Sequence, residues 1–419
     1  MSDTKYFPQL QGITTAKHNL SEIVLHTPLQ KNLNLSEEFN ANVFLKREDL
    51  QIVRSYKIRG AYNKIAQLSD AERKKGVVCA SAGNHAQGVA YSCRLLGIEG
   101  KIYMPTTTPK QKIKQVKMFG KTHVEVIITG DTYDDAHRAA LEDCQKTGMS
   151  FIHPFDDPQI IEGQATVGME ILQDSTETID YLFVPIGGGG LAAGVGAYIK
   201  QISPNTKIIG VEPAGAPSMQ KSLEANSVIK LENIDKFVDG AAVQRVGEIT
   251  FEICKQVVDE YQSVPEGKIC TKILELYNRD AIVIEPAGAL SIAALDFYRE
   301  EIKGKNVVCI VSGSNNDITR TEEIKERSLL YEGLKHYFIV RFPQRAGALR
   351  TFVDVVLGPT DDVTHFEYSK KTNREKGPAV IGIEVQKKED FNGLVKRMDE
   401  NGFIYEYLNE KADLFQFLI

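Results

Sequence analysis

The sequence has no tryptophan, few cysteines and no excess of positive charge. Its 50 Lys and Arg residues are outnumbered by 56 Asp and Glu, which gives a formal net charge of −6. Nucleic acids and anionic membranes attract concentrated positive charge, so this balance argues against both as general partners. The chain also lacks any apolar run of about 18 residues, so we expect no membrane-spanning helix.

The cysteines form no C-x-x-C pair, which argues against a zinc ribbon or a thioredoxin-type site. Cys79 and Cys309 lie inside apolar runs, where a thiol behaves as a small core residue. The first residues, MSDTKYFPQLQG, have neither the basic start nor the apolar stretch of a signal peptide. A chain of this length does not need disulfides to fold. We therefore expect it in a reducing cytoplasm.

Hydrophobic residues make up 42% of the 419 residues, and the length predicts two or three domains. From about residue 40 to 320, short apolar segments such as GVVCAS, VEVIIT and NVVCIVS alternate with stretches of helical periodicity. Strands that are apolar on both faces are typical of parallel sheets covered by helices. This alternation predicts an α/β architecture of open parallel sheets, with ligands at the carboxyl ends of the strands.

The pattern changes after residue 320. The charged segment 321–335 is interpreted as a helical or linker segment, and 336–419 shows the order βαββαβ of a ferredoxin-like domain. The expected organisation is therefore a catalytic part, 1–320, with two lobes, of which the smaller covers about 50–150. The small C-terminal domain follows the linker.

Four consecutive glycines, Gly187 to Gly190, stand before Leu191, between an expected strand and an expected helix. Glycine lets the backbone approach a ligand closely, and a helix N-terminus presents N–H groups to an anion. A phosphate site is the natural interpretation. Gly187, Gly189 and Ala192 also fit a relaxed G-x-G-x-x-G/A pattern, with Glu212 as a ribose-binding acid. A nicotinamide-dependent oxidoreductase therefore stays open at this point.

Three further motifs carry reactive or polar groups. Lys57, in SYKIRG, is either a solvated helix lysine or, in a desolvated pocket, an amine that forms imines. The SAGNHAQG segment from Ser81 follows a strand and opens a helix. It could bind a carboxylate or simply cap the helix through Ser81 or Asn84. Ser312, in SGSNN, also follows directly after a strand.

In this order, SYKIRGA, SAGNHAQG, GGGGL, EPAGA and SGSN resemble the pyridoxal-phosphate enzymes of the tryptophan-synthase-β type. Within them the chain is similar to the threonine (serine) dehydratases, over about residues 20–320. The resemblance implies fold type II, with two open parallel-sheet lobes, and pyridoxal 5'-phosphate as the cofactor. An oxidoreductase would need neither Lys57 nor the Ser312 motif, and an intact Lys57 motif also argues against a non-catalytic amino-acid sensor.

The resemblance also implies roles for the motifs. Lys57 would attach the cofactor covalently and act as the general base. The expected cofactor-binding residues are Lys57, Asn84, Gly187, Gly188, Gly189, Gly190, Leu191 and Ser312. Asn84 would bind the ring hydroxyl and Ser312 the pyridine nitrogen, where a hydroxyl makes a weaker electron sink than a carboxylate. The substrate carboxylate is expected at Ser81, Ala82, Gly83 and Asn84.

The implied reaction is the dehydration and deamination of L-threonine to 2-oxobutanoate and ammonia, the first step of isoleucine biosynthesis. A relative that acts on serine, as a dehydratase or a racemase, is the alternative. Glu212 matches one acid of a metal site in related serine racemases, but Ser218 replaces the second, so we expect no divalent metal. Glu285 matches a family segment near the cofactor and receives no role. It could equally be a helix-initiating acid before Pro286.

The turn FPQRAGAL, residues 342–349, resembles the P-G-A-L turn of ACT-like regulatory domains, with Ala346 where proline is common. This resemblance implies that an amino acid, L-isoleucine, binds near Arg345, Gly347 and Leu349 and inhibits the enzyme. The alternative is a domain that only drives oligomerisation. We expect a homodimer or a homotetramer.

Overall fold

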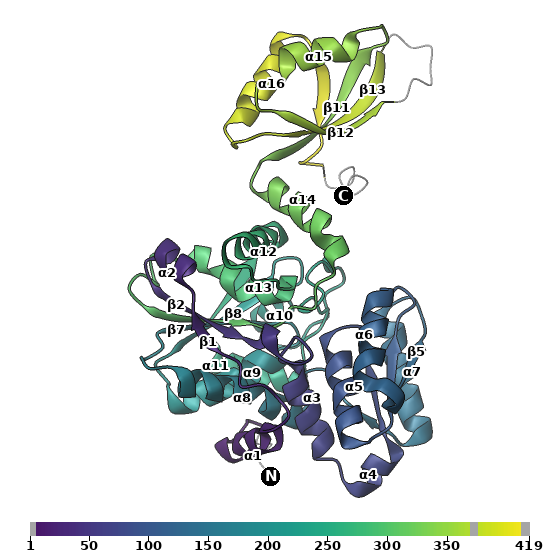
Figure 1. Cartoon of the computed structure of the whole chain (residues 1–419), viewed down its shortest axis with the longest axis vertical. Helices are drawn as coiled ribbons and strands as arrows, with labels where there is room; N and C mark the ends of the chain where they lie inside the picture. Colours follow the sequence, from purple (N-terminus) through teal and green to yellow (C-terminus); the bar gives the residue numbers. More distant parts are fainter. Residues whose placement is uncertain (1–5, 369–375, 412–419) are drawn as a thin grey trace. The chain divides into compact units, whose positions relative to one another are not determined.

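The structure is a computed structural model that describes residues 6–368 and 376–411. The chain divides into two compact units, Met1–Asp317 and Ile318–Ile419 (Figure 1). The first unit contains two separate sheets, and each forms the centre of one lobe. The segment expected to be helical or a linker contains a helix, α14 (Thr321–Tyr331), which lies in the second unit.

The large lobe is built on a six-stranded sheet in the order β1-β2-β10-β7-β8-β9. Its strands are β1 (Leu29–Lys31), β2 (Asn42–Arg47), β7 (Tyr181–Pro185), β8 (Lys207–Pro213), β9 (Glu260–Val264) and β10 (Asn306–Val311). All neighbours pair in parallel except β1, which lies antiparallel at the edge. Its helices are α1 (Leu10–Leu20), α2 (Leu33–Phe39), α8 (Pro158–Asp174), α9 (Gly190–Ile202), α10 (Ser218–Glu224), α11 (Glu248–Val257), α12 (Glu266–Asp280) and α13 (Pro286–Ala293).

The small lobe has a fully parallel sheet in the order β5-β4-β3-β6. Its strands are β3 (Val77–Ala80), β4 (Gly100–Met104), β5 (Val124–Ile128) and β6 (Ser150–Phe151). Its helices are α4 (Asp70–Lys75), α5 (Asn84–Leu96), α6 (Lys110–Gly120) and α7 (Tyr133–Thr147). Helix α3 (Lys57–Ala66) packs against both α8 of the large lobe and α5 of the small lobe. The predicted open parallel sheets are confirmed.

The second unit contains a four-stranded antiparallel sheet in the order β12-β13-β11-β14. After α14 come β11 (Lys335–Pro343), α15 (Ala348–Val356), β12 (Asp362–Tyr368), β13 (Lys376–Glu384), α16 (Asp390–Glu400) and β14 (Ile404–Tyr407). Phe338, Phe352, Ile381, Leu394 and Met398 are fully buried in its core. The element order confirms the predicted ferredoxin-like βαββαβ fold.

The cysteines follow the sequence-based expectation. All six are free thiols, and Cys79 and Cys309 are completely buried in strands β3 and β10. Burial also raises the pKa of both thiols, so neither forms a thiolate readily. Within the ranges that the structure describes, no helix is long and apolar enough to cross a membrane.

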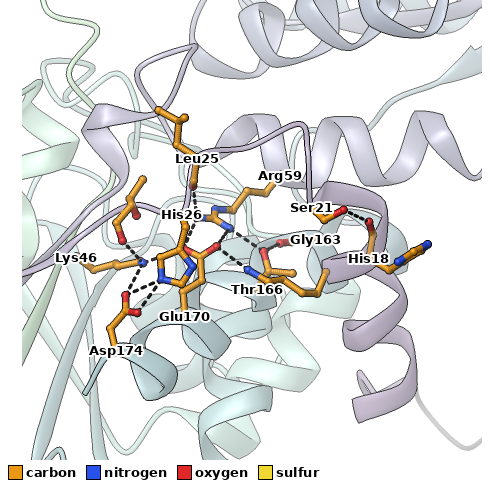
Figure 2. A network of polar contacts seen from close by, with 12 residues as sticks. His18, Ser21, Leu25, His26, Lys46, Arg59, Gly163, Thr166, Glu170 and Asp174 are labelled. Carbon is orange, nitrogen blue, oxygen red and sulfur yellow. Dashed lines mark hydrogen bonds and ion pairs between the residues drawn. The ribbon is translucent and has the colours of Figure 1, made fainter. Parts of the chain in front are cut away.

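A buried ion network holds α3 in place (Figure 2). The Arg59 guanidinium donates to both carboxylate oxygens of Glu170, on α8, at 2.8 Å. It also donates to both oxygens of Glu48, after β2, at 2.7 and 2.8 Å. Lys46, on β2, donates to Glu170 at 2.8 Å and to the carbonyl of Thr27 at 2.6 Å. The network therefore joins α3 to the large sheet and to α8.

Four charged residues of this network, Lys46, Glu48, Arg59 and Glu170, are fully buried, and their charges balance. Burial opposes ionisation of Glu170, but Arg59 and Lys46 outweigh it and lower its pKa to about 2. Such a network need not add stability over an apolar core, because desolvation cancels much of the attraction. The network does fix the positions of its side chains, because a partner that moved away would leave a buried charge without its counter-charge.

Replacing Arg59 by methionine should lower the free energy of unfolding by about 3–5 kcal/mol, because the buried Glu48 loses its counter-charge and Glu170 keeps Lys46 but loses the arginine fork. His26→Asn is the control. His26 pairs with Asp174 nearby, but both side chains are partly exposed, and such pairs contribute less than about 1 kcal/mol. Urea unfolding followed by far-UV circular dichroism measures both variants. Equal stability of Arg59→Met and the wild-type chain would contradict this view of the network.

Candidate active site

The motifs singled out in the sequence gather at the carboxyl ends of parallel strands. Ser81 follows β3, Gly187 follows β7 after one residue, and Ser312 follows β10. Lys57 begins α3, and the backbone N–H of Tyr56 donates to the carbonyl of Ser312 at 3.2 Å. Ligands of open α/β sheets bind at the carboxyl ends of the strands, so the arrangement is that of a binding site.

The Lys57 amine lies in a desolvated place within this site. Its Nζ donates to the carbonyl of Pro154 at 2.9 Å and lies 5.4 Å from the centre of the Tyr56 ring. Burial lowers the pKa of Lys57 to about 8, although the carboxylate of Glu285 acts in the opposite direction. A much larger fraction of this amine is uncharged near neutral pH than for an exposed lysine, which makes it a competent nucleophile and base.

The segment 153–157 connects Lys57 to the glycine loop, and sequence reasoning missed it. Pro154 accepts the Lys57 hydrogen bond, and the ring of Phe155 lies against Gly188. Asp156 accepts the backbone N–H groups that open α11, and Asp157 caps α8. The segment reads HPFDD, and its aspartates before helices were the available signal. The contact through the Pro154 carbonyl leaves no signal in side-chain identity.

The glycine loop is shaped for an anion. Gly189 has φ +92°, a conformation that favours glycine, and a Cβ at Gly188 would overlap the Phe155 ring. Within the described ranges, the N–H groups of Gly187, Gly188 and Gly189 donate to no protein acceptor. Buried backbone N–H groups rarely go unpaired, so these donors are available to a ligand at the start of α9.

The carbonyl groups of the loop are turned away from this position. The Thr250 hydroxyl, on α11, donates to the Gly188 carbonyl at 2.6 Å, and the Cys254 thiol contacts the Gly189 carbonyl at 3.7 Å. Because α11 binds these carbonyls, the loop presents its donors rather than its acceptors to the site. Leu191 is buried in the first turn of α9.

The second expected anion pocket, Ser81 to Asn84, is open and polar. Gly83 is the N-cap residue of α5 and makes no side-chain cap, so neither Ser81 nor Asn84 caps this helix. The Ser81 hydroxyl accepts instead from the N–H of Gly83 at 3.2 Å. A Cβ at Gly83 would have no neighbour within 4 Å, which leaves space above the helix end for a small molecule.

Asn84 and Ser312 belong to one polar surface. Ser312 is 3% exposed, and the backbone of Gly313 pairs with that of Ser55. The Asn84 amide donates to Glu285 at 2.7 Å and accepts from the Asn315 amide. The structure therefore brings the Lys57, Ser81, glycine-loop and Ser312 motifs together and adds Glu285 to them.

Glu212 does not face an open metal site. Its carboxylate accepts the N–H groups of Met219 and Gln220, at 2.7 and 2.8 Å, and so binds the start of α10. Burial raises the pKa of Glu212 to about 8, and these two hydrogen bonds offset it only in part. Across the described ranges, no three His, Cys, Asp or Glu side chains are grouped to hold a metal ion.

In the second unit, a cavity of about 360 Å³ opens at the turn between β11 and α15. Gly347, with φ +82°, is the N-cap residue of α15. The structure thus brings Arg345, Gly347 and Leu349, the residues expected from sequence, into the lining of one cavity. The rest of the lining is Phe342, Pro343, Ala348, Arg350, Phe366 and Tyr368.

Comparisons with known proteins decide the family. The family described as pyridoxal-phosphate dependent enzyme matches residues 20–313. The chain is 61% identical, over 98% of its length and 99% of the relative's, to the biosynthetic L-threonine dehydratase IlvA of Halalkalibacterium halodurans. The chain belongs to the biosynthetic threonine dehydratases. The corresponding enzyme of Bacillus subtilis is 58% identical, over 98% of this chain and 97% of that one.

The other comparisons agree with this family. The family described as the C-terminal regulatory domain of threonine dehydratase matches residues 326–418. Threonine deaminase isoform 2 of Solanum lycopersicum superposes with a TM-score of 0.73 and 43% identity, over 76% of this chain and 92% of that one. Maize serine racemase gives a TM-score of 0.72 and 30% identity, over 78% and 99%. The predicted fold type II is confirmed, and the nicotinamide alternative loses its support.

As a biosynthetic threonine dehydratase, the chain is a pyridoxal-phosphate-dependent enzyme with a regulatory domain. The residues present fit this cofactor. Its phosphate requires several unpaired N–H donors, which the glycine loop has, and its aldehyde requires an amine that is easily deprotonated, which Lys57 has. The open space at Gly83 leaves room beside them for an amino acid.

In the chain freed of cofactor, the rate at which Lys57 reacts with an acylating reagent should rise with pH to a plateau. It should reach half of its maximum at about pH 8. Below this pKa the amine is mostly protonated and unreactive, whereas an ordinary lysine has a pKa of about 10.4. Peptide mapping by mass spectrometry over a pH series measures the rate at Lys57. A midpoint above pH 10 would show that the amine is not desolvated.

Proposed function

We propose that this chain converts L-threonine to 2-oxobutanoate and ammonia. The observation that carries the proposal is the identity of about three residues in five to enzymes named biosynthetic threonine dehydratase, over nearly the full length of both chains. The site supports it because three features lie at the carboxyl ends of the strands. They are the Lys57 amine, the unpaired N–H groups of the glycine loop and the open, polar start of α5. The substrate loses its hydroxyl as water, and hydrolysis of the enamine product releases ammonia.

In this proposal, the residues of the site divide the work. When bound, pyridoxal phosphate withdraws electrons from the Cα of the amino acid and so acidifies the proton there. Lys57 holds the cofactor covalently and, as a free amine, accepts that proton at Nζ. The N–H groups of Gly187 to Gly190 and Leu191 bind the phosphate. Ser81, Ala82, Gly83 and Asn84 receive the substrate carboxylate, and this fixes which substrate bond faces Lys57.

Asn84 also binds the hydroxyl of the cofactor ring, and Ser312 faces the pyridine nitrogen. The Ser312 side chain is a neutral hydroxyl in a buried position, so it cannot hold a positive charge on the ring as a carboxylate does. With a neutral hydroxyl at this position, the bound ring would withdraw electrons less strongly, which would favour loss of the β-hydroxyl over transamination.

We further propose that L-isoleucine inhibits the enzyme by binding the cavity of the second unit. Arg345 and Arg350 at the rim can pair with a carboxylate, and Phe342, Phe366 and Tyr368 supply apolar surface for a branched side chain. Inhibition requires that isoleucine bind two conformations of the enzyme with different affinity. The match of residues 326–418 to a regulatory domain supports this use of the cavity.

Replacing Lys57 by alanine should reduce threonine turnover at least about 10³-fold, because both the covalent link and the general base are lost. Production of 2-oxobutanoate by the purified chain measures the change, and circular dichroism checks that the fold is intact.

In the wild-type chain, kcat/KM for the conversion of threonine to 2-oxobutanoate should exceed kcat/KM for the conversion of serine to pyruvate. Preference for serine would favour the serine-acting alternative.

Replacing Arg345 by alanine should raise the isoleucine concentration for half-inhibition about tenfold, because a charge-assisted hydrogen bond to the carboxylate is lost. Arg341→Ala is the matched control, since Arg341 is an exposed arginine of β11 outside the cavity lining. Inhibition curves of the full-length variants measure both. Equal inhibition of the Arg345→Ala and Arg341→Ala enzymes would remove Arg345 from the effector site.

A further inference from the structure

Glu285, which the sequence left without a role, connects the two lobes at the active site. It is the N-cap residue of α13 in the large lobe, and only 4% of its surface is exposed. Its Oε1 accepts from Nδ2 of Asn84, at the start of α5 in the small lobe, at 2.7 Å. Its Oε2 accepts the backbone N–H of Asn315 at 3.2 Å. Among the residues that the structure describes, both hydrogen bonds to this carboxylate therefore come from N–H donors.

The Asn84 amide is held at both ends. Its Nδ2 donates to Glu285, while its Oδ1 accepts from Nδ2 of Asn315, which also donates to the Val53 carbonyl at 3.0 Å. Rotating the Asn84 amide by half a turn would place its oxygen against the Glu285 carboxylate and its nitrogen against that of Asn315. Because the ionised carboxylate can only accept, it determines which way the amide points.

We propose that Glu285 is a positioning residue that makes Asn84 present an N–H group, rather than its carbonyl, to the oxygen substituent of the cofactor ring. Nδ2 of Asn84 carries two hydrogens, and Glu285 binds one of them, so one donor remains. An N–H facing the ring oxygen stabilises its ionised form. The inference rests on the proposed contact of Asn84 with the cofactor and explains how that contact acquires its polarity.

The protein leaves a specific space for this carboxylate. A Cβ at Gly313 would lie 2.5 Å from Oε1 of Glu285, and a Cβ at Gly240 would lie 3.4 Å from it. Any other residue at Gly313 would therefore displace the carboxyl group. The Glu285 carboxylate thus explains the glycine that follows Ser312.

Charged groups from several elements face Glu285. Burial and Asp239 raise its pKa to about 7, whereas Asn84, Lys112 and Asn315 act to lower it. Lys112, on α6, pairs with Asp239, and the charge of Glu285 is felt by Lys57 and Tyr56 at the start of α3. Protonation below about pH 7 would turn one oxygen into a donor that faces a donor. The proposed orientation is therefore best maintained above that pH.

Titration of pyridoxal phosphate into the full chain freed of cofactor tests the proposal. Glu285→Gln should weaken binding about tenfold, because the amide has one accepting oxygen and an NH2 group that would face one of the two donors. Its holoenzyme should also show the pH-dependent change in visible absorbance at a higher pH, since the ring oxygen loses a donor. Glu162→Gln is the matched control. Glu162 lies on α8 outside the site, its pKa is also raised, and its carboxylate accepts a hydrogen bond from the Tyr6 hydroxyl. This variant should change neither quantity.

A double-mutant cycle shows whether Glu285 acts through Asn84. If it does, Glu285→Gln should weaken binding in the wild-type background but not in an Asn84→Ala background. Equal losses in both backgrounds, or a loss explained by a lower melting temperature of the Glu285→Gln apoenzyme, would overturn the proposal. Weaker binding by Asn84→Ala with no effect of Glu285→Gln would overturn this inference alone. No effect of Asn84→Ala would also remove Asn84 from the proposed cofactor site.

Discussion

The two forks of hydrogen bonds between Arg59 and the carboxylates of Glu48 and Glu170 are the constraint on which the catalytic unit depends. Arg59 lies two residues after Lys57, so the network that holds the arginine also fixes the first turn of α3 and the origin of the lysine side chain. The partners come from the turn that follows β2 and from α8. A reactive lysine thereby sits on a rigid element rather than on a mobile loop, which is what precise proton transfer requires.

The segment from His153 to Asp157 extends this constraint to the rest of the site. The Pro154 carbonyl accepts the hydrogen bond of Lys57, and the Phe155 ring packs where a Cβ at Gly188 would lie. The two aspartates that follow cap α11 and α8. Since α11 binds the carbonyls of the glycine loop, one short segment relates the lysine to the unpaired N–H donors. An amine and an anion site at a fixed separation are what a phosphorylated aldehyde needs.

The sequence predicted the elements whose signals are local. The parallel strands follow from their apolar runs, and the glycine loop and Lys57 lie in contiguous motifs. The contacts between Asn84 and Glu285, 201 residues apart, could not be read in this way, because each residue alone fits a helix start equally well. The same holds for Arg59, whose buried carboxylate partners lie on two different elements, and for the carbonyl of Pro154, which any residue could supply.

The central claim is that Lys57 is the amine to which the cofactor is bound. Reduction of the yellow holoenzyme with borohydride, followed by digestion and mass spectrometry, tests it directly because reduction makes the link permanent. We expect the phosphopyridoxyl group on Lys57, in the tryptic peptide that runs from Ser55 to Arg59. Finding the group on another lysine, such as the buried Lys46 or Lys272, would contradict it.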